Sequence, residues 1–503
     1  MDWFNSFLEN WQEWKVEIQG AVEGVAGLLW STPMIVFCLG VGLLFTILTR
    51  VVQVRLFKDM IKNIFSGEKS SAGVSSFQAL AISLSGRVGT GNIAGTATAI
   101  AMGGPGAVFW MWTIAFIGAS SAFIESTLAQ IYKVKQDGEY RGGPAYYIEK
   151  GIGWRWYGIL FAGSAILAMS LLMPGVQAFA IGDGLSNAFG ANKTYVGIGL
   201  VLVIALIIFG GVKRIATVAQ YVVPFMAVAY ILVSLYIIAV NFTELPAVFG
   251  LIFRSAFAFD SAFGGIIGMA IAWGVKRGIY SNEAGQGTGP HAAAAAEVSH
   301  PAKQGLVQAF SVYIDTLLVC SATAFMILFT GMYNVENPEG GFIANNLGAN
   351  VEAGPAYTQA AIESAIPGFG AGFVGIALLF FAFTTIMAYY YIAETNVAYL
   401  VRGRKNAIPM FLLKVVLLAS TYYGVVNNSK IAWALGDIGL GIMVWLNLVA
   451  ILILAKPALR VLKDYDEQKK QGLDPVFNPD KLGIKNAEFW TEDYQEEKKE
   501  RIS

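Results

Sequence analysis

Long runs of apolar residues alternate with short polar and charged clusters along most of the chain. A helix needs about 20 apolar residues to cross the hydrocarbon core of a bilayer. Eleven windows approach or exceed that length, and they predict an all-α membrane protein with eleven transmembrane helices. The windows cover residues 30–52, 74–104, 106–132, 156–187, 194–212, 217–241, 259–288, 306–333, 369–400, 408–426 and 431–455.

Two of these windows contain glycine-bearing segments that disfavour a regular helix. Residues 86–95 hold four glycines together with Arg87 and Asn92, and residues 273–278 read Trp-Gly-Val-Lys-Arg-Gly. Each glycine costs a helix roughly 1 kcal/mol relative to alanine. Irregular backbone at membrane depth survives only inside protein or beside a water-filled cavity. We therefore predict a break in each window, and paired breaks in two halves of a chain are typical of the central site of a secondary transporter.

The charged residues support this picture and predict an orientation. Only 14% of residues are charged, against about 25% in soluble domains. Lysine and arginine cluster after the first, third, fifth, ninth and last windows, whereas the alternate loops are nearly bare of them. By the positive-inside rule this predicts an outside N-terminus and a cytoplasmic C-terminus in the cell membrane. The balance of 34 basic and 34 acidic residues gives no indication of a nucleic-acid partner.

The window count also predicts the domain organisation. Removing the first window leaves ten, which divide into two sets of five, and an odd set enters the membrane from the opposite side in its second copy. The second set would then be an inverted repeat of the first. The predicted units are an interfacial amphipathic segment at 1–25, an extra transmembrane helix and cytoplasmic loop at 26–73, the repeats at 74–241 and 242–455, and a solvated cytoplasmic tail at 456–503. A short surface helix is expected over residues 357–365.

The first break offers groups that suit a zwitterion and a cation. Free amides at a restarting helix attract anions, so Thr90 and Gly91 are candidates to bind a substrate carboxylate. Carbonyls before the break, near Ser85 and Val88, are candidate sodium ligands, and the Asn92 oxygen is one for a second cation. The alternative is that the glycine spacing serves close helix packing.

Other polar residues inside the windows leave more than one interpretation open. Gln177, after Pro174 and Gly175, suits either a substrate headgroup or an interhelical hydrogen bond. Trp273 suits either an apolar pocket wall or interfacial anchoring. For the charges that follow it we favour structural ion pairs over substrate contact; these are Lys276, Arg277 and Glu283.

Two further pairs of polar residues lie inside the windows, and the sequence alone gives them no specific function. Thr384 and Thr385 most simply donate back to their own helix. Glu125 and Glu394 are functional candidates because they are ionisable and lie within apolar windows. The motifs of serine hydrolases, zinc proteases and nucleotide-binding loops are missing from the sequence, which disfavours an enzyme and points to an ion gradient as the energy source.

Two segments carry a family resemblance. Residues 89–95 (Gly-Thr-Gly-Asn-Ile-Ala-Gly) and 281–289 (Ser-Asn-Glu-Ala-Gly-Gln-Gly-Thr-Gly), with the His291 run behind the second, resemble the alanine or glycine:cation symporter family, the sodium:alanine symporters. The resemblance implies the leucine-transporter fold, with its 5+5 inverted repeat, plus one extra N-terminal helix. It also implies uptake of small neutral amino acids, alanine or glycine, with sodium as the coupling ion and no organic cofactor.

The resemblance assigns roles to particular residues. It places substrate at the first break and in a pocket wall, formed by Gly89, Thr90, Gly91, Asn92, Gln177, Trp273 and Gly274. It places sodium among oxygens of Ser85, Val88, Phe381, Thr384 and Thr385. Arg87 departs from the small residue expected there, which argues against a second sodium beside the substrate.

Three rival functions follow from the same residues. The scaffold could carry glutamine, or it could be coupled to protons through Glu125 or Glu283. A channel is the rival from a different class, because broken helices also line pores. One chain in a lipid bilayer is sufficient for the carrier, and the sequence does not set an oligomeric state.

Overall fold

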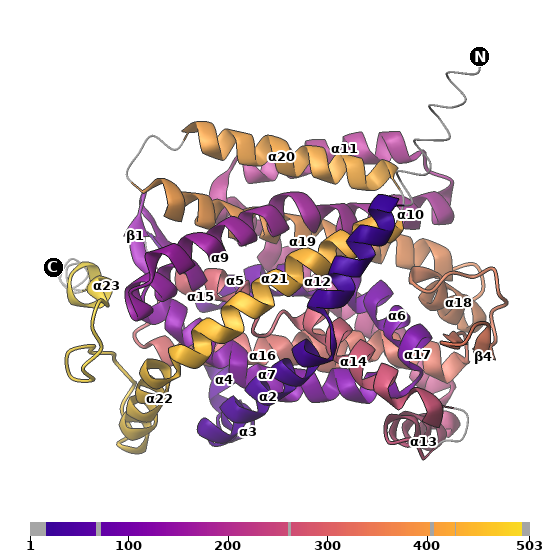
Figure 1. The fold of residues 1–503 in the computed structure, drawn as a ribbon, viewed down its shortest axis with the longest axis horizontal. Helices are drawn as coiled ribbons and strands as arrows, with labels where there is room; N and C mark the ends of the chain where they lie inside the picture. Colours follow the sequence, from indigo (N-terminus) through magenta and orange to yellow (C-terminus); the bar gives the residue numbers. More distant parts are fainter. Residues whose placement is uncertain (1–16, 67–71, 260–262, 403–406, 428, 495–503) are drawn as a thin grey trace.

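The computed structural model describes residues 17–66, 72–259, 263–402, 407–427 and 429–494 of the 503. It is helical apart from two antiparallel two-stranded hairpins (Figure 1). Short 3₁₀ or π-helical segments are labelled η. The elements up to the middle of the chain are α2 (Thr32–Leu48), α3 (Val52–Arg55), α4 (Phe57–Ile64), α5 (Ser76–Arg87), η1 (Gly91–Gly95), α6 (Thr96–Gly103), α7 (Gly106–Ile131), β1 (Val134–Gln136), β2 (Glu139–Arg141), α8 (Pro144–Tyr147), η2 (Ile148–Ile152), α9 (Arg155–Leu167), η3 (Ala168–Leu172), α10 (Pro174–Phe189), α11 (Lys193–Ile208), α12 (Gly211–Val240), η4 (Phe242–Glu244) and α13 (Leu245–Ala256). The remaining elements are η5 (Gly264–Ile266), α14 (Ile267–Asn282), α15 (Gly289–Ala295), α16 (Pro301–Val312), η6 (Tyr313–Cys320), α17 (Ser321–Thr330), β3 (Asn334–Glu336), β4 (Phe342–Asn345), α18 (Pro355–Ala365), α19 (Gly370–Val401), α20 (Ala407–Val426), α21 (Ser429–Ile453), α22 (Ala455–Lys470) and α23 (Glu488–Thr491).

Helix occupies every window that the sequence marked as a span. Among the described residues, 8 helices are long and apolar enough to cross a membrane. The other windows hold the 16-residue α11, the 16-residue α14 and the interrupted pair α5 and α6. The helical multi-pass architecture is thus confirmed, whereas the number of eleven crossings stays a prediction.

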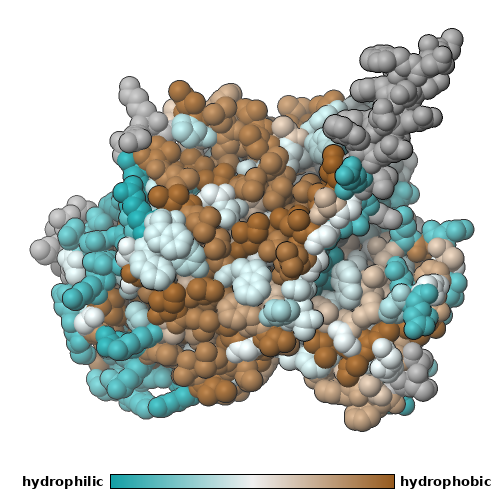
Figure 2. All heavy atoms as spheres, in the orientation of Figure 1, coloured by the Kyte–Doolittle hydropathy of each residue, from teal (hydrophilic) through white to brown (hydrophobic). Residues whose placement is uncertain are grey.

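The surface has the polarity of a protein immersed in lipid. Apolar side chains cover the middle of the face in Figure 2, and hydrophilic ones gather toward its left and right edges. Large apolar side chains elsewhere on the surface also have most of their area exposed, such as Leu206 at 70% and Phe225 at 66%. Water would penalise so extended an apolar surface, whereas lipid tails cover it without cost.

The two edges carry different structures. At the left of Figure 1 lie β1, α22 and α23, and at the right lie α13, α18 and β4. Two of the basic clusters predicted to face the cytoplasm belong to the first group, around β1–β2 and the start of α22. The helix predicted at 357–365 is confirmed as α18, which begins slightly earlier, at Pro355.

The predicted cytoplasmic tail is docked against the helical bundle over the part of it that the structure describes, while many of its side chains remain exposed. The side chains of Tyr465, Phe477 and Trp490 are buried, and the Trp490 indole donates to the carbonyl of Gln130 at 2.9 Å. Ion pairs Arg55–Asp466 at 2.7 Å and Lys469–Asp59 at 2.8 Å tie α22 to the first loop. Aromatic residues scattered among charges supply enough apolar area to dock the segment, although its average composition is polar.

The predicted interfacial segment at 1–25 falls mostly on residues 1–16, which lie outside the described residues. Its described part, from Glu17, is helical and forms one apolar stretch with α2 up to Leu48.

Candidate functional site

The predicted first break is confirmed. Helix α5 ends at Arg87, Val88 has non-helical angles (φ −78°, ψ 88°), and the chain resumes as the π-helical turn η1 before α6. Glycine is required by close approach, because a Cβ on Gly89 would lie 2.5 Å from the Thr385 hydroxyl and one on Gly91 would lie 3.1 Å from the Tyr280 ring. The break therefore packs directly against α19 and α14.

Neutral side chains hold the amides at this break. The Thr90 amide donates to Gln177 Oε1 at 3.0 Å, and the Gly89 amide donates to Asn92 Oδ1 at 2.8 Å. Gln177 in turn donates to the Tyr389 hydroxyl at 3.3 Å. All these groups are buried. A carboxylate makes stronger hydrogen bonds to amides than a neutral carbonyl does, so it could take the place of Gln177 at Thr90.

Four of the five predicted sodium ligands lie close together. The Thr385 hydroxyl is 3.5 Å from the Val88 carbonyl and 2.9 Å from the Phe381 carbonyl, and the Thr384 hydroxyl is 3.0 Å from the same Phe381 oxygen. The Ser85 hydroxyl donates to its own helix, at Ile82, so only the Ser85 carbonyl remains a candidate. Both threonines thus bond back to their helix, and Thr385 also faces the first break. Buried carbonyl and hydroxyl oxygens are the ligands that a hard cation prefers.

The prediction of a second break at residues 273–278 is wrong. Helix α14 runs without interruption from Ile267 to Asn282. Its glycines serve contact with α7 instead, because a Cβ on Gly274 would lie 2.5 Å from the Ala107 carbonyl oxygen and one on Gly278 would lie 2.5 Å from Ile114. Small residues that let helices approach closely give the same sequence signal as a break. Gly274 accordingly faces α7.

The second break lies one helical stretch later, between α14 and α15. Glu283 has φ 55°, Gly285 has φ 81° and Gly287 has φ 87°, so the chain turns through left-handed conformations before α15 begins at Gly289. This is the segment 281–289 on which the family resemblance rests. The glycines of this segment are a sign of the break in the sequence, but the adjacent glycines of α14 led us to predict the break at residues 273–278 instead.

A buried carboxylate, not a neutral amide, holds the second break. Glu125 on α7 accepts from the amides of Gly285 at 3.2 Å and Gly287 at 3.1 Å, and from the side chain of Asn447 at 2.7 Å. Glu125, for which the sequence suggested a role only in the rival hypothesis of proton coupling, therefore fixes the backbone of the break. Its partners could not be read from sequence spacing, because they come from the distant loop between α14 and α15 and from Asn447 on α21.

The predicted ion pairs of α14 are confirmed in kind, with a partner that sequence reasoning missed. Lys276 and Arg277 both pair with Asp437 on α21, at 2.6 Å and 3.2 Å. Trp273 is half-buried beside them, with its ring 5.0 Å from Lys276 Nζ. Glu283 takes no part in these pairs. An acid inside an apolar window was the available signal for Asp437.

Two more charged side chains are buried near the first break. Arg87 donates to the Gln308 carbonyl at 3.1 Å and to the Ser311 hydroxyl. Asp315, also missed from the sequence, lies on η6 and accepts from the Asn92 side chain at 2.6 Å. The Asn92 oxygen proposed for a second cation is therefore engaged with Gly89, and its nitrogen with Asp315. Glu394 pairs with Arg141 at 3.1 Å at the far end of α19, away from the break.

Comparison with known proteins identifies relatives over nearly the whole chain. Residues 15–479 match the sodium:alanine symporter family. The "Putative sodium/proton-dependent alanine carrier protein YrbD" of Bacillus subtilis (strain 168) is 70% identical over 96% of this chain and 99% of its own length. The "Sodium/proton-dependent alanine carrier protein" of Bacillus sp. (strain PS3) is 59% identical over 88% of this chain and 99% of its own. The "Probable sodium/glutamine symporter GlnT" of Bacillus subtilis (strain 168) is 46% identical over 93% of this chain and 95% of its own.

Solved structures give a likeness of fold alone. A manganese transporter of Eremococcus coleocola superposes with a TM-score of 0.51 at 14% identity, covering 82% of this chain and 86% of that one. The two chains therefore share a transporter fold without close sequence relationship.

Proposed function

The chain belongs to the sodium:alanine symporter family, and from that premise we propose that it imports alanine or glycine together with sodium by alternating access. It is a multi-pass membrane transporter and not an enzyme. The amino acid, the ion and the residues that bind them are proposals, each supported by contacts described above.

The different caps of the two breaks favour the first as the substrate site. Gln177 at the first break is neutral and can yield the Thr90 amide to a carboxylate. At the second break Glu125 already occupies the amides of Gly285 and Gly287, and its charge would repel a second carboxylate. The substrate carboxylate would thus bind Thr90 and Gly91, with Gln177 displaced toward the rest of the amino acid. This is the single observation on which the proposal depends most.

The oxygen cluster between α5 and α19 supports a sodium site. Sodium there would bridge Val88, before the first break, to Phe381, Thr384 and Thr385 on the opposite helix, with the Ser85 carbonyl as a further ligand. Holding α5 against α19 would favour one of the two access states. Sodium must bind the two states with different affinity, since equal binding shifts nothing.

The driving force of such a cycle is sufficient for accumulation. Moving one sodium charge inward contributes about 2.3 kcal/mol per 100 mV of membrane potential, in addition to its concentration gradient.

Trp273 and the Lys276–Asp437 pair lie together between α14 and α21. We propose that these side chains close over the bound amino acid from outside.

The wider architecture is part of the proposal. We propose eleven crossings, a cytoplasmic C-terminus and two inverted five-helix units at 74–241 and 242–455. The helices fit this arrangement, because the first helix of each unit contains a break. The 26–73 helix would then be the additional one.

Uptake into proteoliposomes tests the proposal. The purified chain should accumulate labelled alanine when sodium is outside, and choline in place of sodium should abolish accumulation. Unlabelled alanine, glycine, serine and glutamine as competitors define the preferred substrate. Alanine entry that ignores the sodium gradient would refute sodium coupling, and flux that does not saturate would favour a channel.

Proton coupling is a second candidate that specific residues favour. Glu125, Glu283 and Asp315 are buried within the membrane-spanning bundle, where a proton can replace a counter-ion. Glutamine as substrate stays an alternative, because one relative is named for it.

A further inference from the structure

Buried carboxyl groups outnumber buried cations around the two breaks. Glu125 and Asp315 have 0% of their surface exposed, Glu283 has 2%, and Arg87, the cation that faces them in the described part of the chain, has 1%. Lys276 and Arg277 are already engaged by Asp437. An uncompensated buried charge costs several kcal/mol, so such groups are paired or take up a proton. At least one of the three carboxyls is therefore expected to be neutral in part of the transport cycle.

Hydrogen bonds distinguish the three. Glu125 accepts three donors spread over both oxygens, which stabilises its anion. Asp315 also has partners on both oxygens, from Asn92 and Ser281 at 2.6 and 3.1 Å and from Thr316 at 2.7 Å.

Glu283 differs from both. Its Oε2 accepts from the Thr288 hydroxyl at 2.7 Å, but its buried Oε1 has no hydrogen-bond partner among the described residues. The anion of Glu283 is thus the least stabilised by local donors. A neutral carboxyl would place an O–H where the anion has an unpartnered oxygen.

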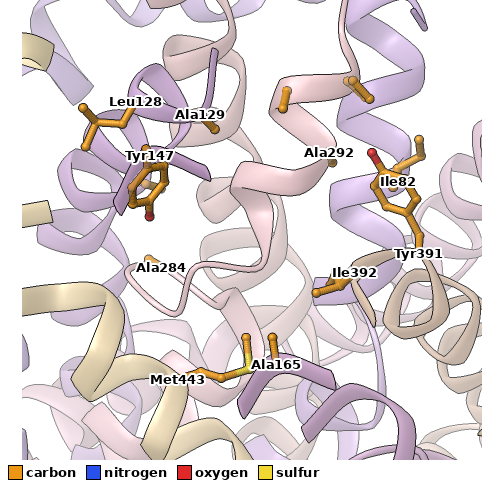
Figure 3. Packing of buried hydrophobic residues seen from close by; sticks show 14 of the residues in the cluster. Ile82, Leu128, Ala129, Tyr147, Ala165, Ala284, Ala292, Tyr391, Ile392 and Met443 are labelled. Atoms are coloured by element: carbon orange, nitrogen blue, oxygen red, sulfur yellow. The ribbon is translucent and has the colours of Figure 1, made fainter. Parts of the chain in front are cut away.

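A small cavity lies beside Glu283. It has a volume of about 10 Å³, which is about the space that one water molecule needs. Its polar wall includes Ser83, whose hydroxyl is also buried without a partner among the described residues. Its apolar wall includes Ile82, Ala292, Tyr391 and Ile392, which Figure 3 shows grouped around α15 and the neighbouring helices. The cavity thus offers a protonated Glu283 either a water molecule or the Ser83 hydroxyl.

The position of Glu283 connects this group to the moving parts of a carrier. Glu283 ends α14 in the left-handed conformation, and a Cβ on Gly86 of α5 would lie 3.4 Å from its Oε2. The carboxyl thus joins the second break to the helix that contains the first. The titratable and charged groups that face it come from several neighbouring elements and are Arg87 on α5, Tyr280 on its own helix, Asp315 on η6, and Tyr389 and Tyr391 on α19.

We propose that Glu283 carries a proton in each transport cycle, an inference that deepens the proposed carrier function and rests on it. The carboxylate binds one proton from water on the outer side and becomes a carboxylic acid, with no other bond made or broken. It releases that proton on the inner side, where the anion is attracted to Arg87. Glu125 keeps its charge throughout, because the three donors of the second break hold it.

The number of protons that enter for each alanine taken up tests whether Glu283 carries the proton. Proteoliposomes containing the purified chain, with equal sodium on both sides and a pH-sensitive dye inside, receive alanine outside. Wild type should acidify the interior in proportion to labelled alanine uptake. Glu283→Gln cannot titrate, so its ratio of protons to alanine should fall about tenfold or more, while alanine counterflow at equal pH persists and shows that it is folded.

Two matched variants sharpen the test. Glu283→Asp keeps a carboxyl and tolerates the left-handed backbone, so it should restore coupled proton entry. Glu125→Gln removes a neighbouring buried carboxyl and should lower total uptake without lowering the proton-to-alanine ratio. An unchanged ratio in Glu283→Gln would overturn the assignment. Sodium-driven uptake by wild type without any acidification would also overturn it while leaving the carrier function intact, whereas a wild type that takes up no alanine under either a sodium or a proton gradient would refute the carrier itself.

Discussion

Replacing Gly274 by alanine tests whether this glycine belongs to a helix break or to a helix interface. The sequence placed it in a break that lines the substrate pocket. In the structure it lies within α14, where an added Cβ would be 2.5 Å from the Ala107 carbonyl oxygen and 2.6 Å from Trp110 Cβ. We expect Gly274→Ala to lower stability, with substrate affinity affected only as a consequence.

Two opposing effects decide whether Gly274→Ala raises or lowers the stability of the protein. Alanine favours a helix interior by about 1 kcal/mol over glycine. Against this, contact at 2.5 Å is about 1 Å shorter than the optimal separation of heavy atoms, so α14 and α7 would have to part by that amount. Overpacking of this kind costs about 1–3 kcal/mol, and here the obstacle is backbone, which cannot rotate away. The net expectation is a loss of stability of up to about 2 kcal/mol.

Gly268 provides the matched control on the same helix. A Cβ there would meet nothing within 4 Å, so Gly268→Ala gains helix propensity without a clash. Thermal inactivation in detergent, followed by size-exclusion chromatography, should rank Gly268→Ala at or above wild type and Gly274→Ala below both. Equal stability of Gly274→Ala and wild type, together with a specific loss of alanine binding, would refute the packing assignment.

Three further predictions follow from the site and the tail. Removing both hydroxyls in the double variant Thr384→Ala and Thr385→Ala should raise the sodium concentration for half-maximal uptake about tenfold or more, since each ligand contributes about 1 kcal/mol; unchanged sodium dependence would exclude the cluster. Trp273→Ala should shift competition toward amino acids larger than alanine, and an unaltered competition profile would place this ring outside the pocket. Burial lowers the pKa of His300, and its contact with Asp464 offsets part of that shift, so His300 binds a proton less readily when the tail is docked than when it is undocked. Protection of the tail from protease should therefore weaken below about pH 6.5, and this weakening should disappear in His300→Gln.

The sequence predicted features that depend on local composition. The apolar windows gave the helices because lipid immersion demands about 20 apolar residues whatever the helix contacts. The first break was predictable because its glycines come with Arg87 and Asn92, which packing alone does not require. The Gly274 region misled because close packing and a break both select glycine, and only the neighbouring helix decides between them.

Features that depend on distant partners could not be predicted in the same way. Asp437 lies about 160 residues beyond the cations that it pairs with, and Asn447 lies still farther from Glu125. The docked tail was missed because its hydrophobic side chains are few and separated, although each is large. In these cases a residue type signals that a partner is needed, but the fold determines which residue supplies it.

The charge of each cap explains why two similar breaks would have different roles. Lipid provides no water to satisfy free amides, so every break in the membrane needs a cap from a neighbouring helix. A carboxylate cap, such as Glu125, stabilises its break too strongly to be exchanged and suits a permanent joint. A neutral cap, such as Gln177, satisfies Thr90 at lower cost and can be exchanged for a substrate carboxylate. Converting Gln177 to Glu should therefore make the first break resemble the second: the chain should fold and bind sodium, but alanine should compete poorly with the new carboxylate, and normal alanine affinity in that variant would contradict the argument.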